Sequence, residues 1–452
     1  MAAAAHRPPL PAGPWLVVGL ARSGQAAARL LAGRGERVLA CDAAHPDGAE
    51  RLEALGVEVH LDGPGTDLLD DVRAVVKSPG VPREAPVVAA AHAAGLPVIG
   101  ELELAWRLLP NRFIGVTGTN GKTTTTELLG HLYRTAGEPV VTAGNVGTPL
   151  ASLPGTLTDD TTVVCECSSF QLEDAEAFAP DCAVFLNLTP DHLDRHGSMD
   201  DYRDAKLRIF AHQGSEAIAV VDDAERVLRD QPPAGGARRL CFDDAAGSEC
   251  ATTVRDGVIH WQGEALIDAD RLALPGPHNR RNAMAAATAA LAMGLPADAV
   301  AAGLGDFPGV AHRLEFVGER GGVRYVNDSK ATNVASAAVG VRSFERGVHL
   351  ICGGSLKGGS FSGLARPVAE RCDAVHAIGE AAAQIAADLE PELRAGPPLT
   401  RHADLPAALR SAHAEAVPGD VVLLSPACAS FDAYTSYEHR GDHFRRLVAE
   451  LP

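Results

Sequence analysis

The segment from Phe113 to Thr126 reads FIGVTGTNGKTTTT and holds the residues with the clearest chemical meaning. A short apolar run precedes a glycine loop, and a helix is expected to begin at Lys122. Such a loop directs backbone N–H groups and a helix N-terminus at one point, which suits a polyphosphate. Lys122 would place a positive charge on the β- and γ-phosphates, and the Thr123 hydroxyl would bind Mg²⁺. The residues predicted to bind ATP are Gly118, Thr119, Asn120, Gly121, Lys122, Thr123 and Thr124.

This loop is shorter than the usual phosphate-binding motif, whose first glycine would fall at Val116. A Gly/Thr turn that joins a strand to a helix is the alternative interpretation. Because a strand, the pattern Gly-x-x-Gly-Lys-Thr and a helix are expected in that order, we favour the ATP site.

Polar side chains further along the chain could complete a metal site. Glu166 lies in the apolar run VVCECSS, where a buried carboxylate is costly unless it is paired or bound to a metal such as Mg²⁺. A side chain that points into solvent is the alternative. His192 and His196 lack the glutamate of a zinc-binding H-E-x-x-H motif, so a zinc site is disfavoured. The two remaining interpretations are a histidine that contacts a Mg²⁺-phosphate site and a polar loop without a ligand. Lys206, in DYRDAKLRIF, is typical of a solvated helix face.

The N-terminal region contains an incomplete dinucleotide-binding motif. The run WLVV leads into a loop from Gly19 to Gly24 that includes Ser23, and Asp42 ends the next strand-like run, where a Rossmann fold places an acid on a ribose. Ala21 stands where the motif has its second glycine, so NAD is disfavoured and another nucleotide such as a uridine diphosphate is expected. Ser78 could add a hydroxyl. A plain strand–helix turn is the alternative.

Three polar clusters near the C-terminus each follow a strand-like run. They read NDSKATN (327–333), GGSLKGG (353–359) and SPACASFDAYTSYEHRGDHF (425–444). Three such clusters with two lysines predict a pocket for an anionic substrate and phosphate, since function concentrates on loops after strands. Loops without a function are the alternative.

The elements that must position these residues alternate along the chain. Short β-branched runs are followed by helical stretches rich in alanine and leucine, a pattern typical of parallel α/β domains. We predict three of them: a Rossmann-like domain over 1–110, a central P-loop mononucleotide-binding domain over 111–311, and a Rossmann-like domain over 312–452. Because ligands of open α/β sheets bind beyond the carboxyl ends of the strands, the polar clusters fall where chemistry is expected.

Composition narrows the classes of partner and location. The 452 residues carry a net charge of −18, which disfavours a nucleic acid. The N-terminal residues have no apolar signal segment, and no long uncharged apolar run predicts insertion into a membrane. The nine cysteines form no CxxC pair, so we expect small buried residues in a reducing cytoplasm.

Several motifs together resemble the Mur ligases of peptidoglycan synthesis over nearly the whole chain. They include GTNGKTT, AGNVG, ECSSFQL, DHLDRHG, AKLRIF, HNRRNAMAA, AHRLE, NDSKATN and the SPACASFD block. The Rossmann-like first domain, SSFQL and SPACASFD are most similar to the member of the family that adds D-glutamate. The resemblance implies an ATP-dependent ligase that joins D-glutamate to the alanine carboxylate of UDP-N-acetylmuramoyl-L-alanine through an acyl phosphate and a tetrahedral intermediate. It also implies a role in cell-wall formation, cell shape and division.

The resemblance assigns roles residue by residue. Glu166 and His192 match the family's magnesium sites, and Lys206 matches a lysine that CO₂ carbamylates, which replaces our interpretation of Lys206 as a solvated residue. A carbamate is an anionic oxygen ligand of the kind that Mg²⁺, or Mn²⁺, prefers. The remaining matches are to the nucleotide (Asn282, Arg313 and Asp328), to the muramoyl substrate (Asn145), and to D-glutamate (Lys330, Thr332, Lys357, Ser430 and Tyr437).

Two residues depart from the family pattern. Tyr437 stands where phenylalanine is expected, and Ala21 replaces a glycine in the first loop. Sister Mur ligases and folylpolyglutamate synthetase are the alternative ligases, although the SPACASFD block and the N-terminal domain disfavour them. No N-K-x-D motif supports a GTPase. We expect a monomer.

Overall fold

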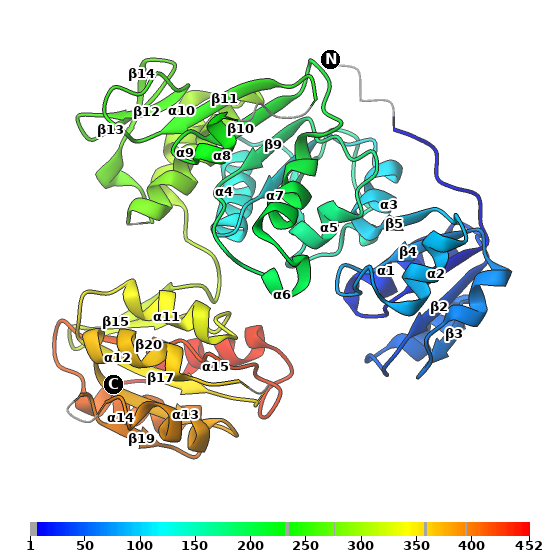
Figure 1. Ribbon diagram of the computed structural model, residues 1–452. Helices are drawn as coiled ribbons and strands as arrows, with labels where there is room; N and C mark the ends of the chain where they lie inside the picture. The colour runs from blue at the N-terminus through cyan, green and yellow to red at the C-terminus, as the bar shows by residue number, and fades with distance from the viewer. Residues whose placement is uncertain (1–6, 231–234, 275, 357–358, 394–395) are drawn as a thin grey trace. The chain divides into compact units, whose positions relative to one another are not determined.

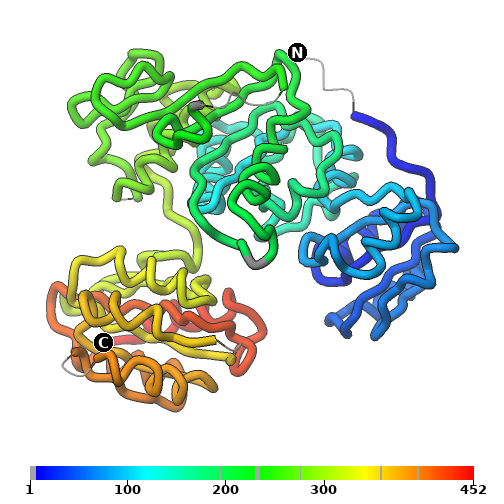
Figure 2. The backbone as a smooth tube through the Cα atoms, in the orientation of Figure 1, coloured from blue at the N-terminus to red at the C-terminus, as the bar shows by residue number. Residues whose placement is uncertain are grey.

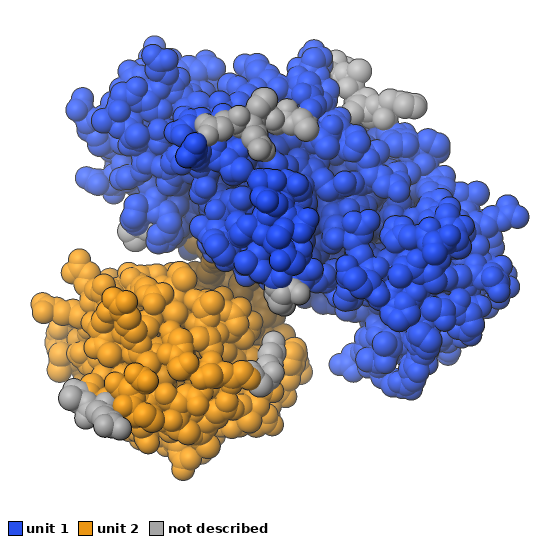
Figure 3. Space-filling model, in the orientation of Figure 1, with its two compact units in different colours: residues 1–308 blue, residues 309–452 orange. Residues whose placement is uncertain are grey.

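A computed structural model describes residues 7–230, 235–274, 276–356, 359–393 and 396–452. The chain divides into two compact units, Met1–Pro308 and Gly309–Pro452 (Figure 3). The first unit contains two β-sheets and the second unit contains one. The fold class predicted from the sequence, three α/β domains with largely parallel sheets, is confirmed; the residue numbers of the domain boundaries stay predictions.

The first sheet has five parallel strands in the order β3-β2-β1-β4-β5. Its central strand β1 is buried along its whole length, as expected for the middle of a parallel sheet with both faces covered. The strands are β1 (Trp15–Val18), β2 (Val38–Asp42), β3 (Glu58–Leu61), β4 (Ala74–Lys77) and β5 (Val98–Gly100). The helices are α1 (Arg22–Gly33), α2 (Pro86–Ala93) and α3 (Glu101–Leu108) (Figure 1).

The second sheet has nine strands in the order β14-β13-β12-β11-β10-β9-β6-β8-β7. Pairing is parallel from β7 to β12 and antiparallel from β12 to β14. The strands are β6 (Phe113–Thr117), β7 (Val140–Gly144), β8 (Thr162–Glu166), β9 (Cys182–Phe185), β10 (Ile218–Asp222), β11 (Arg238–Asp243), β12 (Thr252–Arg255), β13 (Val258–Trp261) and β14 (Glu264–Asp268). The helices are α4 (Lys122–Thr135), α5 (Ser169–Glu173), α6 (Leu193–His196), α7 (Met199–Leu207), α8 (Arg226–Asp230), α9 (Pro277–Ala292) and α10 (Ala297–Asp306).

A continuous apolar core joins these two sheets. One cluster of buried side chains extends from Val17 and Leu102 beside the first sheet to Phe178 and Phe185 beside the second. The Lys77–Asp174 ion pair, 2.6 Å long and buried on both sides, lies at the same junction. The first two sheets therefore belong to one compact unit.

The third sheet has six strands in the order β15-β16-β20-β17-β18-β19, and only β15 is antiparallel. Its strands are β15 (Glu315–Arg320), β16 (Val323–Asn327), β17 (Val348–Gly353), β18 (Cys372–Ile378), β19 (Leu399–Arg401) and β20 (Val421–Leu424). Its helices are α11 (Val334–Arg342), α12 (Ala365–Arg371), α13 (Ala382–Leu389), α14 (Leu405–Glu415) and α15 (Tyr437–Ala449). Figure 2 traces this unit in yellow to red.

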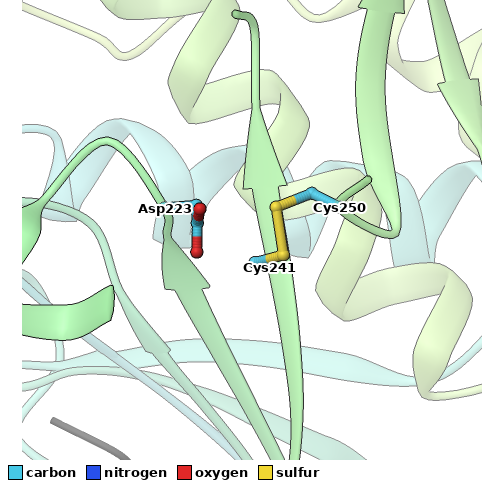
Figure 4. A group of neighbouring side chains, drawn as sticks. All are labelled: Asp223, Cys241 and Cys250. Atoms are coloured by element: carbon cyan, nitrogen blue, oxygen red, sulfur yellow. A yellow bond between two sulfur atoms is a disulfide. The ribbon is translucent and has the colours of Figure 1, made fainter. Parts of the chain in front are cut away.

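The prediction for the cysteines is wrong at two positions. Seven cysteines are buried and free, as expected. Cys241 on β11 and Cys250 form a disulfide across nine residues, and Figure 4 shows Asp223 beside it. The two thiols meet because the loop after β11 folds back before β12, with a Cα–Cα distance of 4.9 Å. Sequence spacing alone does not show that return.

Among the described residues, no helix is both long and apolar enough to cross a membrane.

Candidate active site

The phosphate loop predicted from the sequence connects β6 to α4. Gly118 and Gly121 have φ angles of +148° and +82°, a region in which glycine is favoured because it lacks a Cβ. Asn187, which follows β9, holds the loop from the side: its carbonyl accepts the Thr119 N–H at 2.9 Å, and its side-chain oxygen accepts the Asn120 N–H at 2.8 Å. Sequence reasoning did not identify Asn187.

The helix α9 closes one side of this loop. Asn282, on the first turns of α9, is buried, and a Cβ built on Gly121 would lie 2.3 Å from its side-chain oxygen. The helices α4 and α9 pack against each other, which fixes this approach. The structure therefore brings the predicted nucleotide residue Asn282 to the start of α4, where the phosphate loop ends.

Glu166 ends β8, the strand that pairs with β6, and stands directly beside Val116 in the ladder. Its side chain is 2% exposed, so the alternative interpretation, in which it points into solvent, is wrong. One carboxylate oxygen accepts a hydrogen bond from the Asn145 amide at 3.0 Å. The other oxygen, Oε2, is buried and has no hydrogen-bond partner among the described residues. A buried carboxylate oxygen without a partner is costly and points to a ligand.

Lys206 on α7 is 1% exposed, which contradicts the prediction from sequence pattern that it lies on a solvated helix face. Its Nζ donates a hydrogen bond to the Gly118 carbonyl at 2.8 Å and lies 4.6 Å from the centre of the Tyr202 ring. Burial, and then the nearby charge of Lys122, lower the pKa of Lys206 from 10.5 to about 7. A large share of this amine is therefore neutral near pH 7.

Two amines converge on the phosphate loop. Lys122 Nζ donates to the Gly118 carbonyl at 3.0 Å and to the Thr119 carbonyl at 2.8 Å, so it shares the Gly118 oxygen with Lys206. Like charges at such a short separation repel each other. An anionic ligand between them, or a chemical change that removes one positive charge, would relieve this repulsion.

His192 lies at the rim of the same region. It has a left-handed backbone, with φ +51°, and an exposed side chain that approaches the ring of Phe170 at 5.0 Å between centroids. Its neighbour His196 stacks on the same phenylalanine and bonds to Ser169 at 2.9 Å. No group of three potential ligands among the described residues includes His192.

The side chains of Asp42 and Ser78, two of the predicted residues of the first sheet, form hydrogen bonds with the backbone of nearby loops. The Asp42 carboxylate accepts the N–H groups of Leu20 at 2.6 Å and Ala44 at 2.9 Å. The Ser78 hydroxyl donates to the Gly19 carbonyl at 2.7 Å, and Ser23 is partly exposed on the first turn of α1. These bonds order the loop, and contact with a ligand stays a prediction.

Arg195 was not identified from the sequence, although it connects the first sheet with the second. Its guanidinium donates to the carbonyls of Pro79 at 3.3 Å and Val81 at 2.9 Å, in the turn that contains Ser78. Its central carbon lies 4.3 Å from the centre of the Phe170 ring. The Arg22 guanidinium donates a hydrogen bond to the carbonyl of Gly147, two residues after Asn145. The Ser78 turn and the Asn145 loop are thus both tied across the junction.

The second unit gathers polar loops at the ends of β16 and β20. Asp328 is 5% exposed, and its carboxylate accepts the Ser425 hydroxyl at 2.7 Å. Burial raises the pKa of Asp328 to about 6, and the positive charges of Arg313 and Lys330 act in the opposite direction. Arg313 and Lys330 therefore lie near Asp328, and a contact of these residues with a nucleotide or substrate stays a prediction.

Arg440 joins the NDSKATN and SPACASFD loops and was missed from the sequence. This buried guanidinium donates to the Ser329 carbonyl at 2.9 Å, the Cys428 carbonyl at 3.1 Å and the Ala429 carbonyl at 3.1 Å. It thereby connects the backbone beside Lys330 to the backbone beside Ser430.

The other predicted residues of this unit lie on the same loops or, for Tyr437, at the start of α15. Thr332 is partly exposed, Ser430 is buried, and the Tyr437 carbonyl accepts the Ser329 hydroxyl at 2.8 Å. Lys357 lies outside the described residues.

Family models cover most of the chain. They are the "Mur ligase MurD-like, N-terminal domain" over residues 14–100, the "Mur ligase middle domain" over 116–290 and the "Mur ligase, glutamate ligase domain" over 312–428.

Curated relatives match over nearly the full length. A protein named UDP-N-acetylmuramoylalanine–D-glutamate ligase from Pelotomaculum thermopropionicum is 43% identical over 446 residues, which cover 96% of this chain and 97% of the relative. The protein with that name from Anaeromyxobacter dehalogenans is 45% identical over 456 residues, with the same coverage. Among solved structures, the UDP-N-acetylmuramate–alanine ligase of Thermotoga maritima matches with a TM-score of 0.59 and 18% sequence identity. The match covers 97% of this chain and 99% of that ligase. At this low identity the similarity supports the fold alone.

Proposed function

The chain belongs to the Mur ligase family, and on this premise we propose that it joins D-glutamate to the alanine carboxylate of UDP-N-acetylmuramoyl-L-alanine, with ATP as the source of energy. The observation that carries the choice of D-glutamate is the identity of 43% and 45% with ligases of that name over 96% of the chain. The product is a precursor of peptidoglycan.

The chemistry requires activation of a carboxylate, which is a poor electrophile. An oxygen of the alanine carboxylate attacks the γ-phosphorus of ATP, ADP leaves, and an acyl phosphate forms. The amine of D-glutamate then attacks the acyl carbon, and the tetrahedral intermediate collapses with loss of phosphate and a proton. The ATP phosphates, the alanine carboxylate and the two carboxylates of D-glutamate are all anionic, so positioning with charge neutralisation supplies most of the catalysis.

We assign Lys122 and the N–H groups of the phosphate loop to the β- and γ-phosphates. The amine of Lys122 already lies against the loop carbonyls of Gly118 and Thr119. A charge at this point stabilises the negative oxygens of the transferred phosphoryl group as they develop. The buried residue Asn282 would limit the space at the end of the loop.

Thr123, Glu166, His192 and Lys206 are the residues that would hold Mg²⁺ in this proposal. The donor set fits a hard cation in one respect: the buried Oε2 of Glu166 has no partner among the described residues. When bound, Mg²⁺ would neutralise phosphate charge and draw the two anionic substrates together.

A carbamate on Lys206 would improve this fit. The neutral amine that burial favours attacks CO₂, and a C–N bond forms as one C=O π bond of CO₂ opens. The nitrogen then loses a proton to water. The product is an anionic oxygen donor in place of a second positive charge beside Lys122. The lowered pKa of Lys206 and its bond to Gly118 support this step.

For the UDP-linked substrate we assign Ser23, Asp42, Ser78 and Asn145. Support comes from the loops that carry Ser78 and Asn145, which are both tied across the junction of the first two sheets. Arg195 acts as a positioning residue, because its contacts are with backbone carbonyls and Phe170.

In the second unit we assign Arg313 and Asp328 to the nucleotide, and Lys330, Thr332, Lys357, Ser430 and Tyr437 to D-glutamate. Support for the described members comes from Arg440, whose hydrogen bonds connect the two loops that carry Lys330 and Ser430. Cationic side chains suit a dicarboxylate substrate.

The experiment that tests this function measures ATP-dependent phosphate release with UDP-N-acetylmuramoyl-L-alanine as the acceptor. D-glutamate, L-glutamate, meso-diaminopimelate and D-alanyl-D-alanine are compared as the amino component. We expect release only with D-glutamate, together with a product that is one glutamyl residue heavier by mass spectrometry. Release with another amino acid would assign a sister ligase, and release only with a pterin acceptor would assign a folylpolyglutamate synthetase.

A matched variant tests the phosphate loop in the same assay. Lys122→Met keeps the aliphatic stem and removes the charge. We expect kcat to fall by at least about 10²-fold, the size of effect that follows removal of one charge-stabilising donor. Near-normal turnover would contradict the assignment of the loop.

A further inference from the structure

A cluster of imidazole groups lies in the second unit, within the sheet and away from the polar loops described above. His349 is on β17 and His376 is on the neighbouring strand β18. Their rings are stacked, with 6.2 Å between centroids and 19° between planes. Because side chains alternate along a strand, both residues share a face with Ile351 and Ile378, which pack in the apolar core beneath α14.

Each of these two rings is held through one nitrogen only. His349 Nε2 lies 3.2 Å from a carboxylate oxygen of Asp420, and His376 Nδ1 lies 3.1 Å from His402 Nε2. The remaining nitrogens, His349 Nδ1 and His376 Nε2, are buried and have no hydrogen-bond partner among the described residues. Two buried nitrogens without partners on adjacent strands are costly, which indicates a missing ligand.

A carboxylate completes the group. Glu415, the last residue of α14, brings one oxygen to 3.9 Å from His376 Nε2. Its other oxygen accepts the Ser411 hydroxyl at 2.8 Å, which orients the side chain. One potential ligand atom from each of His349, His376 and Glu415 lies within 4.8 Å of the other two.

The surroundings match those of a metal site. Asp420 accepts a hydrogen bond from His349 Nε2, so the lone pair of that ring lies on Nδ1, and a hydrogen bond from His376 Nδ1 to His402 can orient His376 in the same manner. Such outer hydrogen bonds orient histidine ligands in metalloproteins. Burial lowers the pKa of His376 to about 4, so the ring is neutral and able to bind a metal at physiological pH. Glu415 is partly exposed, which gives an ion access from solvent.

We propose that His349, His376 and Glu415 bind a divalent transition-metal ion, and that Zn²⁺ is the ion this donor set fits best. Two imidazole nitrogens and one carboxylate oxygen are ligands that Zn²⁺ accepts, with water in the fourth position. Ligand bonds of about 2.0–2.2 Å would require the three atoms to move closer together on binding. The site involves none of the residues assigned to ATP, D-glutamate or Mg²⁺.

The proposal is tested by Zn²⁺ titration of the full-length, metal-free protein in a calorimeter, with Co²⁺ absorption as a spectroscopic probe of the ligands. Glu415→Gln keeps the size of a partly exposed side chain and removes its charge, and His376→Ala removes a buried ligand. His60→Ala, at an exposed histidine of the first unit, is the matched control. We expect the wild type and His60→Ala to bind one more equivalent of Zn²⁺ than Glu415→Gln or His376→Ala.

A second variant measures the outer hydrogen bond. His402→Ala should weaken Zn²⁺ binding by about 10–100-fold, as found for partners of metal ligands. We also expect Zn²⁺ to raise the melting temperature of the wild type and to leave that of Glu415→Gln unchanged. Equal Zn²⁺ stoichiometry and affinity in the wild type and Glu415→Gln would overturn the proposal, because Zn²⁺ would then bind elsewhere. These results do not depend on ligase activity.

Discussion

The buried amine of Lys206 gives the sharpest prediction, since its burial lowers its pKa from 10.5 to about 7. At a pH between these two pKa values, Lys206 is protonated in the unfolded chain and neutral in the folded chain. Stability therefore rises with pH in this window, at up to about 1.4 kcal/mol per pH unit. Between about pH 7.5 and 9.5 the two-state relation gives a gain of about 2–3 kcal/mol from this one group.

Lys206→Met retains an unbranched side chain of similar length and removes the titrating group. We expect the unfolding free energy of the wild type, minus that of Lys206→Met, to increase by about 2–3 kcal/mol over this pH range. All other titrating groups are common to both proteins, so their contributions cancel in the difference. The measurement is urea unfolding followed by tryptophan fluorescence in buffer freed of CO₂, because a carbamate would remove the titrating amine.

A difference that stays constant with pH would refute the reasoning. It would mean that the amine remains charged in the folded protein, and a charged amine does not attack CO₂. The result therefore bears on catalysis as well as on stability. If the prediction holds, readmission of ¹³C-labelled CO₂ should produce a carbamate NMR signal in the wild type that is absent in Lys206→Met.

Two further substitutions test the architecture of the site. Gly121→Ala and its control Gly137→Ala both introduce a Cβ at positive φ, which costs about 1–2 kcal/mol of stability in each variant. The new Cβ at Gly121 would lie 2.3 Å from the Asn282 side chain, whereas nothing lies within 4 Å of a Cβ at Gly137. We expect calorimetry to show at least about tenfold weaker ATP binding for Gly121→Ala alone, and equal ATP affinity in both variants would contradict the loop geometry. Arg195→Ala should lower the unfolding free energy by about 1.5–3 kcal/mol in urea titrations, because charged hydrogen bonds across the sheet junction are lost. Arg37→Ala, which removes an exposed ion pair, should lower the unfolding free energy by clearly less than Arg195→Ala does. An equal loss in the two arginine variants would show that the contacts of Arg195 are no stronger than a surface pair.

The sequence predicts many of the parallel strands because they are short, buried runs rich in β-branched residues that end in a polar loop. The strands β6, β8 and β20 are examples. The antiparallel extension formed by β12, β13 and β14 was not predicted, since its partly exposed strands lack that signature. The phosphate loop was found from its glycines and Lys122 alone.

Other parts of the site depend on tertiary structure that local pattern does not encode. Lys206 lies on a helix of polar composition, and only packing against the phosphate loop buries it. Arg195, Asn187 and Arg440 act through backbone carbonyls or amides far away in sequence. The order of residue types along the chain does not reveal hydrogen-bond partners that are distant in sequence. The role of Lys206 was predicted from the resemblance to the Mur ligases, because the residues around it in the sequence indicate only a solvated helix face.

The most direct test of the ligase mechanism follows one oxygen atom. UDP-N-acetylmuramoyl-L-alanine is prepared with ¹⁸O in the alanine carboxylate and incubated with the protein, ATP and D-glutamate. If the carboxylate attacks the γ-phosphorus and phosphate then leaves the acyl carbon, the released phosphate carries one ¹⁸O from the substrate. Phosphate that contains no ¹⁸O, released together with amide product, would contradict the acyl-phosphate pathway and with it the central claim for this site.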